Sequence, residues 1–199
     1  MNVFVTGTDT DAGKTTVSAW ICSKVQTTYW KIVQTGSCSD SDVIRKFAPN
    51  TEILPEACRL RAPLSAYDAA KEEHVAIDVC KFRTNRDKIV IEGSGGLLVP
   101  IADQFLMIDA IQSTHSQVVL VSRAKMGMIN HLLLTISALR SRFIPILGLV
   151  ICGNLDKNIQ ATIEHFSHEK ILTILPETDN LEQVFEETPL PHSILEALS

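Results

Sequence analysis

Paired cysteines are missing from this chain of 199 residues. The five cysteines are odd in number, and no two of them form a CxxC motif; they are Cys22, Cys38, Cys58, Cys80 and Cys152. This spacing argues against a disulfide framework and against a zinc site, and it favours reduced thiols in a cytosol. The first residues show no basic stretch followed by an apolar run and a cleavage site, so we expect no signal peptide and a cytoplasmic location.

Long apolar runs and an excess of basic residues are lacking as well. No uncharged apolar run reaches the roughly 18 residues that suggest a membrane span, so we expect no membrane partner. The net charge of -5 at pH 7 provides no basic field that would attract nucleic acid. Repeats, low-complexity segments and obvious linkers are absent, which favours a single domain over residues 1–199, large enough to bury a core of its own.

The chain does contain short apolar runs that are rich in Val and Ile and alternate with helix-like segments. The runs show no strict in-out alternation, as expected of parallel strands covered on both faces. We therefore predict a three-layer α/β fold with a mostly parallel central sheet flanked by helices. The expected strands are 2–6, 88–93, 117–122, 144–151, 171–175 and, more weakly, 29–34; the expected helices are 14–25, 42–47, 103–114, 130–141 and 159–167. Residues 37–85 are the least regular and are interpreted as an insertion that shapes a site.

The first expected strand runs into the loop VTGTDTDAGKTT. A P-loop has the spacing G-x4-G-K-[ST], which places its first glycine at Thr8, whereas Gly7 stands one position earlier. The order of apolar strand, loop and helix is nevertheless that of a phosphate-binding loop. Lys14 would neutralise phosphate oxygens and Thr15 would bind Mg²⁺. The two aspartates are unexpected in a loop that receives anions.

Charged residues also mark other strand ends, where ligands bind in sheets of this kind. Glu92 ends a buried strand before a glycine-rich turn, which suits a Mg²⁺ ligand or a turn cap. Asp42 is either a further metal ligand or an N-cap. Lys31, inside or just after a buried strand, either faces an anion or lies solvated at an edge.

Two later strand ends complete the candidate set. The helix start at 127–130 would present free N–H groups to a carboxylate or phosphate. Asn154 could read a nucleotide base, and NLDK in place of N-K-x-D argues against guanine. His165 and His168 are three residues apart, which favours an exposed helix face over a metal site. No G-x-S-x-G elbow or Ser-His-Asp order is present.

Together these motifs resemble the dethiobiotin synthetases, ATP-dependent enzymes that close the ureido ring in biotin synthesis. The resemblance runs nearly end to end and rests on GTDTDAGKTT, KIVQTG, APLSA, IEGSGGLLVP, MGMINHLLLT and GLVICGN. The family loop G-T-[DN]-T-x-x-G-K-T accounts for the position of Gly7. The resemblance implies a P-loop NTPase-like fold and the cofactors ATP and Mg²⁺. It also implies the substrates 7,8-diaminopelargonic acid and CO₂ or bicarbonate, and a homodimer with the substrate at the subunit interface.

The resemblance also implies roles for individual residues. Lys14, Lys31 and Asp11 would act in catalysis, with Lys31 on the carbamate formed from CO₂ and the substrate amine. Thr15, Asp42 and Glu92 would hold Mg²⁺. The nucleotide site would comprise Thr10, Asp11, Ala12, Gly13, Lys14, Thr15, Thr16 and, on adenine, Asn154. The substrate site would comprise Lys31, Thr35, Gly95, Gly96 and a helix start of the other subunit formed by Met126, Gly127, Met128, Ile129 and Asn130.

One departure from the family pattern concerns the turn after Lys31. Ile32 replaces a common proline, so we expect that turn to be less rigid. The main alternative function is a P-loop switch ATPase that acts through partner binding, although such loops carry an extra lysine where this chain has Asp9. A related ATP-dependent amidase or ligase domain and an inactive family member are further alternatives.

Overall fold

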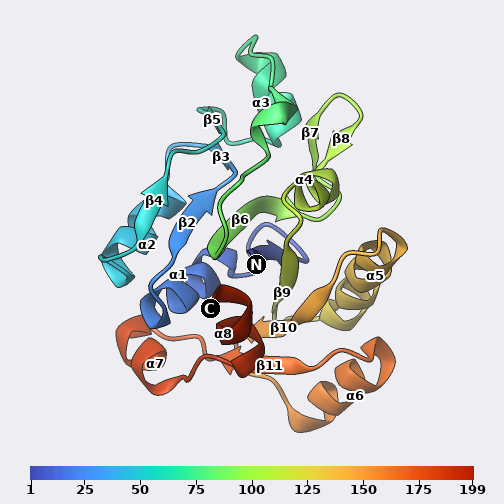
Figure 1. Cartoon of the computed structure of the whole chain (residues 1–199). Coiled ribbons are helices and arrows are strands. Elements are labelled where there is room, and N and C mark those ends of the chain that lie inside the picture. The colour runs from blue at the N-terminus through green and yellow to red at the C-terminus, as the bar shows by residue number, and fades with distance from the viewer.

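The structure, a computed structural model, describes residues 1–199 and is built around one seven-stranded sheet. Figure 1 shows this sheet at the centre, with helices on both of its faces. The strand order is β11-β10-β9-β1-β6-β2-β4, and every pairing in this sheet is parallel. The strands are β1 (Val3–Gly7), β2 (Thr28–Lys31), β4 (Glu52–Leu54), β6 (Ile89–Gly96), β9 (Gln117–Arg123), β10 (Ile146–Cys152) and β11 (Ile171–Leu175). The predicted three-layer α/β fold with a mostly parallel sheet is confirmed.

Two apolar clusters cover the two faces of the sheet. Side chains alternate between the faces along a strand, so Phe4 packs into one cluster while Val3 and Val5 pack into the other. The helices α4 (Met107–Ser113), α5 (Met128–Ser141) and α6 (Lys157–Ser167) contribute to the Phe4 cluster. The helices α1 (Lys14–Lys24), α2 (Asp40–Phe47), α7 (Leu181–Glu187) and α8 (His192–Leu198) contribute to the other cluster.

A smaller group of elements lies at the top of the view in Figure 1. It holds a parallel two-stranded sheet of β3 (Val33–Thr35) and β5 (Cys58–Leu60), the helix α3 (Ala66–Glu72) and the 3-10 turn η1 (Val79–Lys81). It also holds an antiparallel hairpin of β7 (Pro100–Ala102) and β8 (Phe105–Leu106). The irregular stretch 37–85 thus contains α2, which was expected at 42–47, and also β4, β5, α3 and η1, which sequence patterns did not separate.

Two predicted elements differ from the observed ones for identifiable reasons. The expected strand 29–34 breaks at Ile32, because its second half leaves the main sheet to pair with β5. The expected helix 103–114 begins only at Met107, because Phe105–Leu106 pairs in the hairpin. The Asp109 carboxylate accepts a hydrogen bond from the Leu106 N–H at 2.8 Å and thereby marks the helix start.

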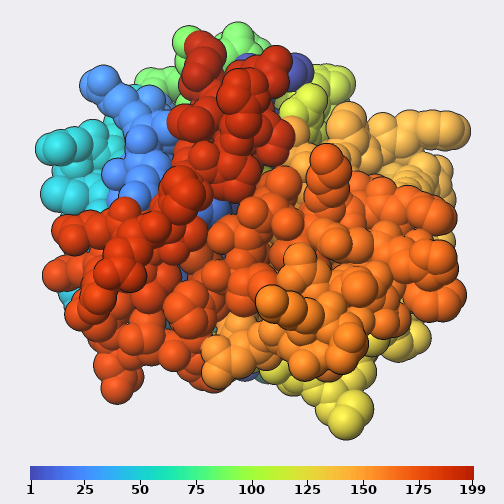
Figure 2. Space-filling view, turned by 90° about the horizontal axis from the view of Figure 1, so that it is seen from below, coloured from blue at the N-terminus to red at the C-terminus, as the bar shows by residue number.

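The C-terminal part of the chain covers one side of the molecule. Figure 2 shows this side formed largely by the orange and red segments, which include α6, α7 and α8. Ile194, Ala197 and Leu198 of α8 are buried against the α1 side of the sheet. None of the helices combines the length and the apolar character needed to cross a lipid bilayer.

Candidate active site

The loop between β1 and α1 is shaped by two glycines that leave no room for a side chain. A Cβ on Gly7 would lie 2.9 Å from the Ala12 Cβ, so the chain can fold back only without one. Gly13 caps α1 in the left-handed region at φ 99°, and a Cβ there would lie 2.5 Å from the Cys152 sulfur. The glycine one position early in the P-loop pattern therefore has a steric reason.

Lys14 is folded back over this loop. Its Nζ donates hydrogen bonds to the carbonyl oxygens of Asp9 and Thr10, both at 2.8 Å, and the side chain is buried. Burial, together with the nearby positive charge of Lys31, lowers the pKa of Lys14 from 10.5 to about 8. Because both of its partners are neutral, the Lys14 cation is left without a counter-charge in direct contact and is suited to receive an anion.

Neither of the two loop aspartates pairs through its side chain with Lys14. Asp9 accepts a hydrogen bond from the Thr10 N–H at 2.7 Å and pairs with Lys125 at 3.0 Å. The hydrogen bond from Lys125 lowers the pKa of Asp9, so Asp9 stays ionised and organises the loop locally. The Asp11 side chain is exposed in the loop.

A carboxylate with no solvent exposure lies at the centre of the site. Glu92 receives hydrogen bonds at Oε1 from Lys31 Nζ and Thr15 Oγ1, both at 2.8 Å. Tyr29 donates its phenol hydrogen bond to Oε2 of the same carboxylate at 2.9 Å. Thr15 belongs to the start of α1 and Lys31 to the end of β2. The start of α1 and the end of β2 therefore meet at Glu92 Oε1.

The sheet register explains why Lys31 reaches Glu92. The two residues lie opposite each other in the parallel β2–β6 pair, and Lys31 also donates to the Gly93 carbonyl at 2.8 Å. The Ile32 N–H donates to the Glu92 carbonyl at 3.1 Å, a bond that a proline at this position could not form. Burial alone lowers the pKa of Lys31, but the charges of Glu92 and Asp40 outweigh it and raise the pKa.

The second acidic residue in the site is Asp40, whereas the sequence had indicated Asp42. Asp40 forms an ion pair with Lys31, and its N–H donates to Gln34 Oε1 at 3.2 Å. The Asp42 side chain is 70% exposed and pairs with Arg45. Two residues along a helix differ by roughly 200° in direction, so Asp40 and Asp42 face opposite ways. The structure therefore brings Asp40, and not Asp42, to Lys31.

The oxygen atoms of this site fit a magnesium ion that shares its coordination with phosphates. Thr15, Asp40 and Glu92 offer a hydroxyl and two carboxylates, which are hard oxygen donors. Nowhere in the chain do three or more His, Cys, Asp or Glu side chains converge in a way that could hold a metal ion. Mg²⁺ is usually bound through one or two carboxylates plus substrate phosphates, so a site with only two acidic residues suits it.

A cavity of about 500 Å³ extends from the loop toward the ends of β10 and β11. Gly13 and Thr16 form one wall, Cys152 and Gly153 form another, and Arg123 lies at its edge. The segment 176–179 after β11 also lines the cavity, and this segment was missed in the sequence. The strand-end rule could have identified it, because the preceding strand was predicted. Asn154 directly follows Gly153 and is exposed.

A second cavity, of about 420 Å³, opens on the other side of the same loop. It is lined by residues 8–10 of the loop, by 96–100 and by one side of α5. Gly96 lies in this wall, and Gly95 turns at φ 66°, where a Cβ would lie 2.7 Å from a Val99 methyl group. The phosphate loop therefore separates two cavities, one on each side.

The remaining predicted substrate residues are spread over β3 and the start of α5. Thr35 is half-buried on β3. Gly127 caps α5 in the left-handed region at φ 87°, after Met126, whose side chain is 99% exposed. Of the other three residues of this helix start, Met128 is buried, Ile129 is half-buried and Asn130 is exposed.

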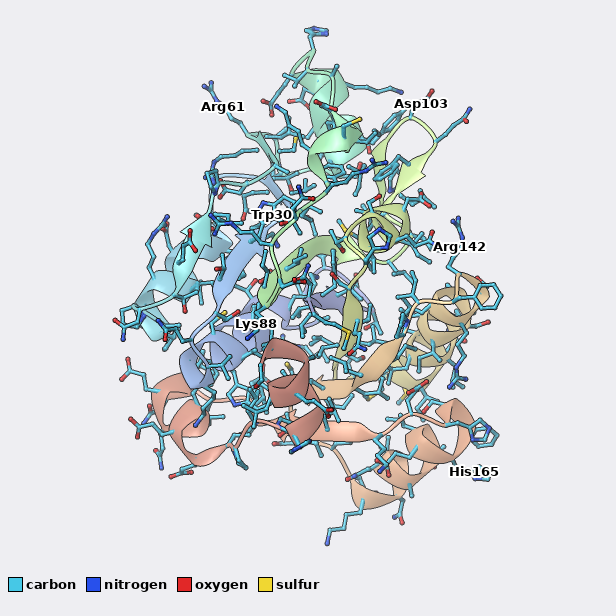
Figure 3. All side chains as sticks on the ribbon, in the orientation of Figure 1. Trp30, Arg61, Lys88, Asp103, Arg142 and His165 are labelled. Carbon is cyan, nitrogen blue, oxygen red and sulfur yellow. The ribbon has the colours of Figure 1, made fainter.

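The histidine pair on α6 takes no part in this arrangement. Figure 3 shows His165 at the outer side of α6, pointing away from the body of the protein. His168 is also exposed and lies just past the helix end. These positions agree with the interpretation of the pair as part of an exposed helix face.

Comparisons with known proteins bear directly on this site. The AAA domain family model matches residues 1–184. The ATP-dependent dethiobiotin synthetase of Paramagnetospirillum magneticum is 43% identical over 175 residues, which cover 85% of each chain. That of Rhizorhabdus wittichii is 41% identical and covers 90% of this chain and 89% of its own.

Among solved structures, the MinC:MinD cell division protein complex of Aquifex aeolicus matches with a TM-score of 0.57. The match covers 99% of this chain and 93% of the other, at 12% sequence identity. At this identity the likeness concerns the fold alone.

Proposed function

Because the chain belongs to the family of ATP-dependent dethiobiotin synthetases, we propose that it uses ATP to join CO₂ to 7,8-diaminopelargonic acid and close the ring of dethiobiotin. The observation that carries the proposal is the convergence of Lys31 and Thr15 on one oxygen of Glu92 beside the phosphate loop. In this proposal Glu92 would be the metal-binding carboxylate, and both lysines would act beside it; the charges of Lys31 and Glu92 already affect the pKa of Lys14. Two anions can meet there despite their mutual repulsion.

The two lysines have separate tasks in this proposal. Lys14 would exchange the carbonyl oxygens of Asp9 and Thr10 for phosphate oxygens of ATP. Lys31, held charged by two carboxylates, would stabilise the carbamate that forms from CO₂ and a substrate amine. Phosphoryl transfer depends mainly on positioning and on electrostatic stabilisation, which these two cations supply.

Thr15, Asp40 and Glu92 would hold Mg²⁺, whose chemistry in such sites is to neutralise charge on the β- and γ-phosphates. Asp40 takes the place that the sequence gave to Asp42, because only Asp40 contacts Lys31. A carboxylate that pairs with Lys31 and also binds the metal links the carbamate side of the site to the phosphate side. Asp11, exposed on the loop, would lie near the reacting amine.

Ring closure needs no covalent bond to the protein. The carbamate oxygen attacks the γ-phosphorus and displaces ADP, which gives a carbamic-phosphoric anhydride. The neighbouring amine of the same molecule, in its neutral form, would then attack the carbonyl carbon, expel phosphate and release one proton, so that a five-membered ring forms. Because both amines belong to one bound molecule, proximity can contribute up to roughly 7–11 kcal/mol.

The two cavities suggest which substrate lies where. The cavity that reaches residues 176–179 would receive the nucleotide base, and Asn154, which directly follows the lining residue Gly153, would contact it. The second cavity, on the far side of the loop, would receive diaminopelargonic acid, with Gly96 in its wall and the adjacent Gly95 as a further contact. Thr35 would contact the substrate from β3.

We also propose that two copies of the chain form a homodimer over the second cavity. Leu98 and Leu134 line this cavity and are 58% and 62% exposed. Met126, at the nearby start of α5, is almost fully exposed. A contiguous exposed apolar patch is typical of an interface, and in this proposal Leu98 and Leu134 would form part of one. The segment 126–130 of one copy would then receive the carboxylate tail of the substrate bound to the other.

Five free cysteines support a reducing compartment, so we propose a cytoplasmic location.

The activity is tested by incubating the protein with diaminopelargonic acid, bicarbonate, Mg²⁺ and ATP and by detecting dethiobiotin with mass spectrometry. We expect product with the natural chain and almost none with Lys31→Ala or Lys14→Ala. The two variants should keep the circular dichroism spectrum of a folded α/β protein. ATP-dependent self-association without any product would instead favour a switch ATPase.

A further inference from the structure

Tyr29 is a buried polar residue for which the reaction described above has no role. It lies on β2, has no solvent exposure, and donates its phenol hydrogen bond to Glu92 Oε2 at 2.9 Å. A tyrosine in an apolar run is typical of a core residue, and Tyr29 does belong to the buried cluster that includes Val90 and Ile44. Its hydroxyl group, however, ends at the central carboxylate of the site.

The geometry of β2 places Tyr29 and Lys31 on the same face of the sheet. They are two residues apart, and side chains repeat with a period of two along a strand. Lys31 lies opposite Glu92, and Tyr29 lies opposite Val90, two residues earlier on β6. The two side chains therefore approach Glu92 from the same strand, and each reaches a different oxygen atom.

The donors divide the two carboxylate oxygens between them. Oε1 receives Lys31 and Thr15, which belong to the substrate side and the phosphate side of the site. Oε2 receives Tyr29, which comes from the core. The phenol thus holds one oxygen toward the interior, and this leaves the other oxygen directed at the phosphate loop.

We propose that Tyr29 is a positioning residue that fixes the Glu92 carboxylate so that Oε1 faces the metal and nucleotide. The inference rests on the proposed Mg²⁺ site. Partners that orient metal ligands from behind commonly change metal affinity or activity by about 10–100-fold when removed. Without the phenol, Glu92 can turn about its side-chain torsions, and its buried Oε2 lacks a donor.

The test compares Tyr29→Phe with Thr27→Val. Thr27 lies just before β2, and its buried hydroxyl donates to the Lys88 carbonyl at the opposite end of the strand from Glu92. Both variants therefore remove one buried hydroxyl group from the same segment. Binding of Mn²⁺ in place of Mg²⁺ is measured by electron paramagnetic resonance in the presence of ADP, and ADP binding is measured separately without metal.

For Tyr29→Phe, we expect the half-saturating Mn²⁺ concentration to rise at least about tenfold, with metal-free ADP binding unchanged. Turnover should recover when Mg²⁺ is raised. Thr27→Val should bind Mn²⁺ like the natural chain. If Tyr29→Phe also binds Mn²⁺ like the natural chain, the inference is wrong while the metal site stands. If the natural chain binds no Mn²⁺ with ADP, the metal site and the inference both fail.

A second measurement covers the case in which Tyr29→Phe does not fold. The chain has only two tyrosines, so 3-fluorotyrosine labelling gives two fluorine resonances, and Tyr67→Phe assigns them. We expect the Tyr29 resonance of the otherwise natural chain to shift when Mg²⁺ and ADP are added together. A Tyr29 resonance that stays in place under saturating Mg²⁺ and ADP would overturn the inference.

Discussion

Lys31 lies directly opposite Glu92 across the parallel β2–β6 pair, and its ammonium group bonds to Glu92 Oε1 at 2.8 Å. Asp40 pairs with the same ammonium group from the start of α2. One buried cation is therefore shared by two carboxylates. Removing Lys31 leaves two like charges close together, whereas removing one carboxylate leaves the ammonium group with a single charged partner, and this determines the first predictions.

Substitution of Lys31 by methionine should reduce both activity and stability. Removing one partner of a buried ion pair typically costs about 3–5 kcal/mol, and the partial exposure of Asp40 favours the lower end. The double variant Lys31→Met/Glu92→Gln should regain much of the lost free energy of unfolding but no activity. Urea unfolding and product formation are the two measurements. Equal stability of the single and double variants would show that the charge imbalance is not the cause.

Asp40 and Asp42 provide a matched pair, because they lie two residues apart on one helix. Asp40→Asn should lower turnover by at least about tenfold, since it removes a charge from Lys31 and from the proposed metal site. Asp42→Asn should stay within about twofold, because its partner Arg45 is exposed and surface pairs contribute little. Steady-state rates at several Mg²⁺ concentrations compare the two. The reverse ranking would mean that α2 turns when substrates bind.

ATP binding should weaken as the pH rises through about 8. The pKa of Lys14 in the free protein is lowered to about 8, so its positive charge is lost above that pH. The ammonium form is the one that attracts phosphate, so kcat/KM for ATP should fall above this value. Since bound phosphates favour the charged form, kcat should fall only at higher pH. Profiles of kcat/KM and kcat between pH 6.5 and 9.5 test this, and superimposable profiles would contradict it.

The lowered pKa of Lys14 affects stability in the opposite direction from ATP binding: the free energy of unfolding increases as the pH rises. Lys14 titrates near 10.5 in the unfolded chain, so between pH 8 and 10.5 the unfolded state binds more protons than the folded state. The contribution of Lys14 to the free energy of unfolding therefore rises with pH in that window. Comparing the natural chain with Lys14→Met by urea unfolding isolates this contribution.

Gly13→Ala should abolish nucleotide binding and destabilise α1. The new Cβ meets the Cys152 sulfur, and the left-handed backbone adds roughly 1–2 kcal/mol of strain. Gly36→Ala is the control, because Gly36 also has a positive φ while its nearest neighbour, Pro63, lies 3.7 Å from the added Cβ. Backbone strain is present in both variants, whereas the clash with Cys152 is present only in Gly13→Ala. Calorimetric melting and ADP titration of the two variants should therefore separate the two effects.

Leu134→Asp should convert the proposed dimer to monomers. The residue is 62% exposed beside the second cavity, and a charge there opposes burial in an interface. Product formation should fall with dimer content, whereas ADP binding should persist because the nucleotide cavity lies across the loop. Phe143→Asp, at a 93% exposed position that lines neither cavity, should leave the molar mass by light scattering unchanged. A natural chain that is monomeric at micromolar concentration would refute the dimer.

Local patterns predicted the sheet well because its strands are short apolar runs between helices. The expected runs at 2–6, 117–122 and 171–175 match β1, β9 and β11 closely. The C-terminal helices α7 and α8 were missed because seven residues are too few to show a helical repeat. The hairpin β7–β8 was missed for a similar reason, since its pairing partner is not visible in a run of two residues.

The sequence predicted the site residues that the strands position. It did not predict which side chain of a helix faces the site. Lys31 ends β2 and lies opposite Glu92 in the middle of β6, so the sheet itself brings them together. Asp40 and Asp42 could not be distinguished, because the face that each occupies depends on where α2 begins and how it packs. Tyr29 carried no signal, because a buried tyrosine in an apolar run has the same pattern whether or not its hydroxyl group has a task.

The position of β6 between β1 and β2 has a consequence for synthesis of the protein on the ribosome. The first 60 residues contain β1 and β2, yet these strands never pair with each other. They flank a gap that is filled only when residues 89–96 emerge. Until then both strands expose backbone edges that invite misassociation. The strand that brings the central carboxylate is thus also the one that first allows the N-terminal half of the sheet to close.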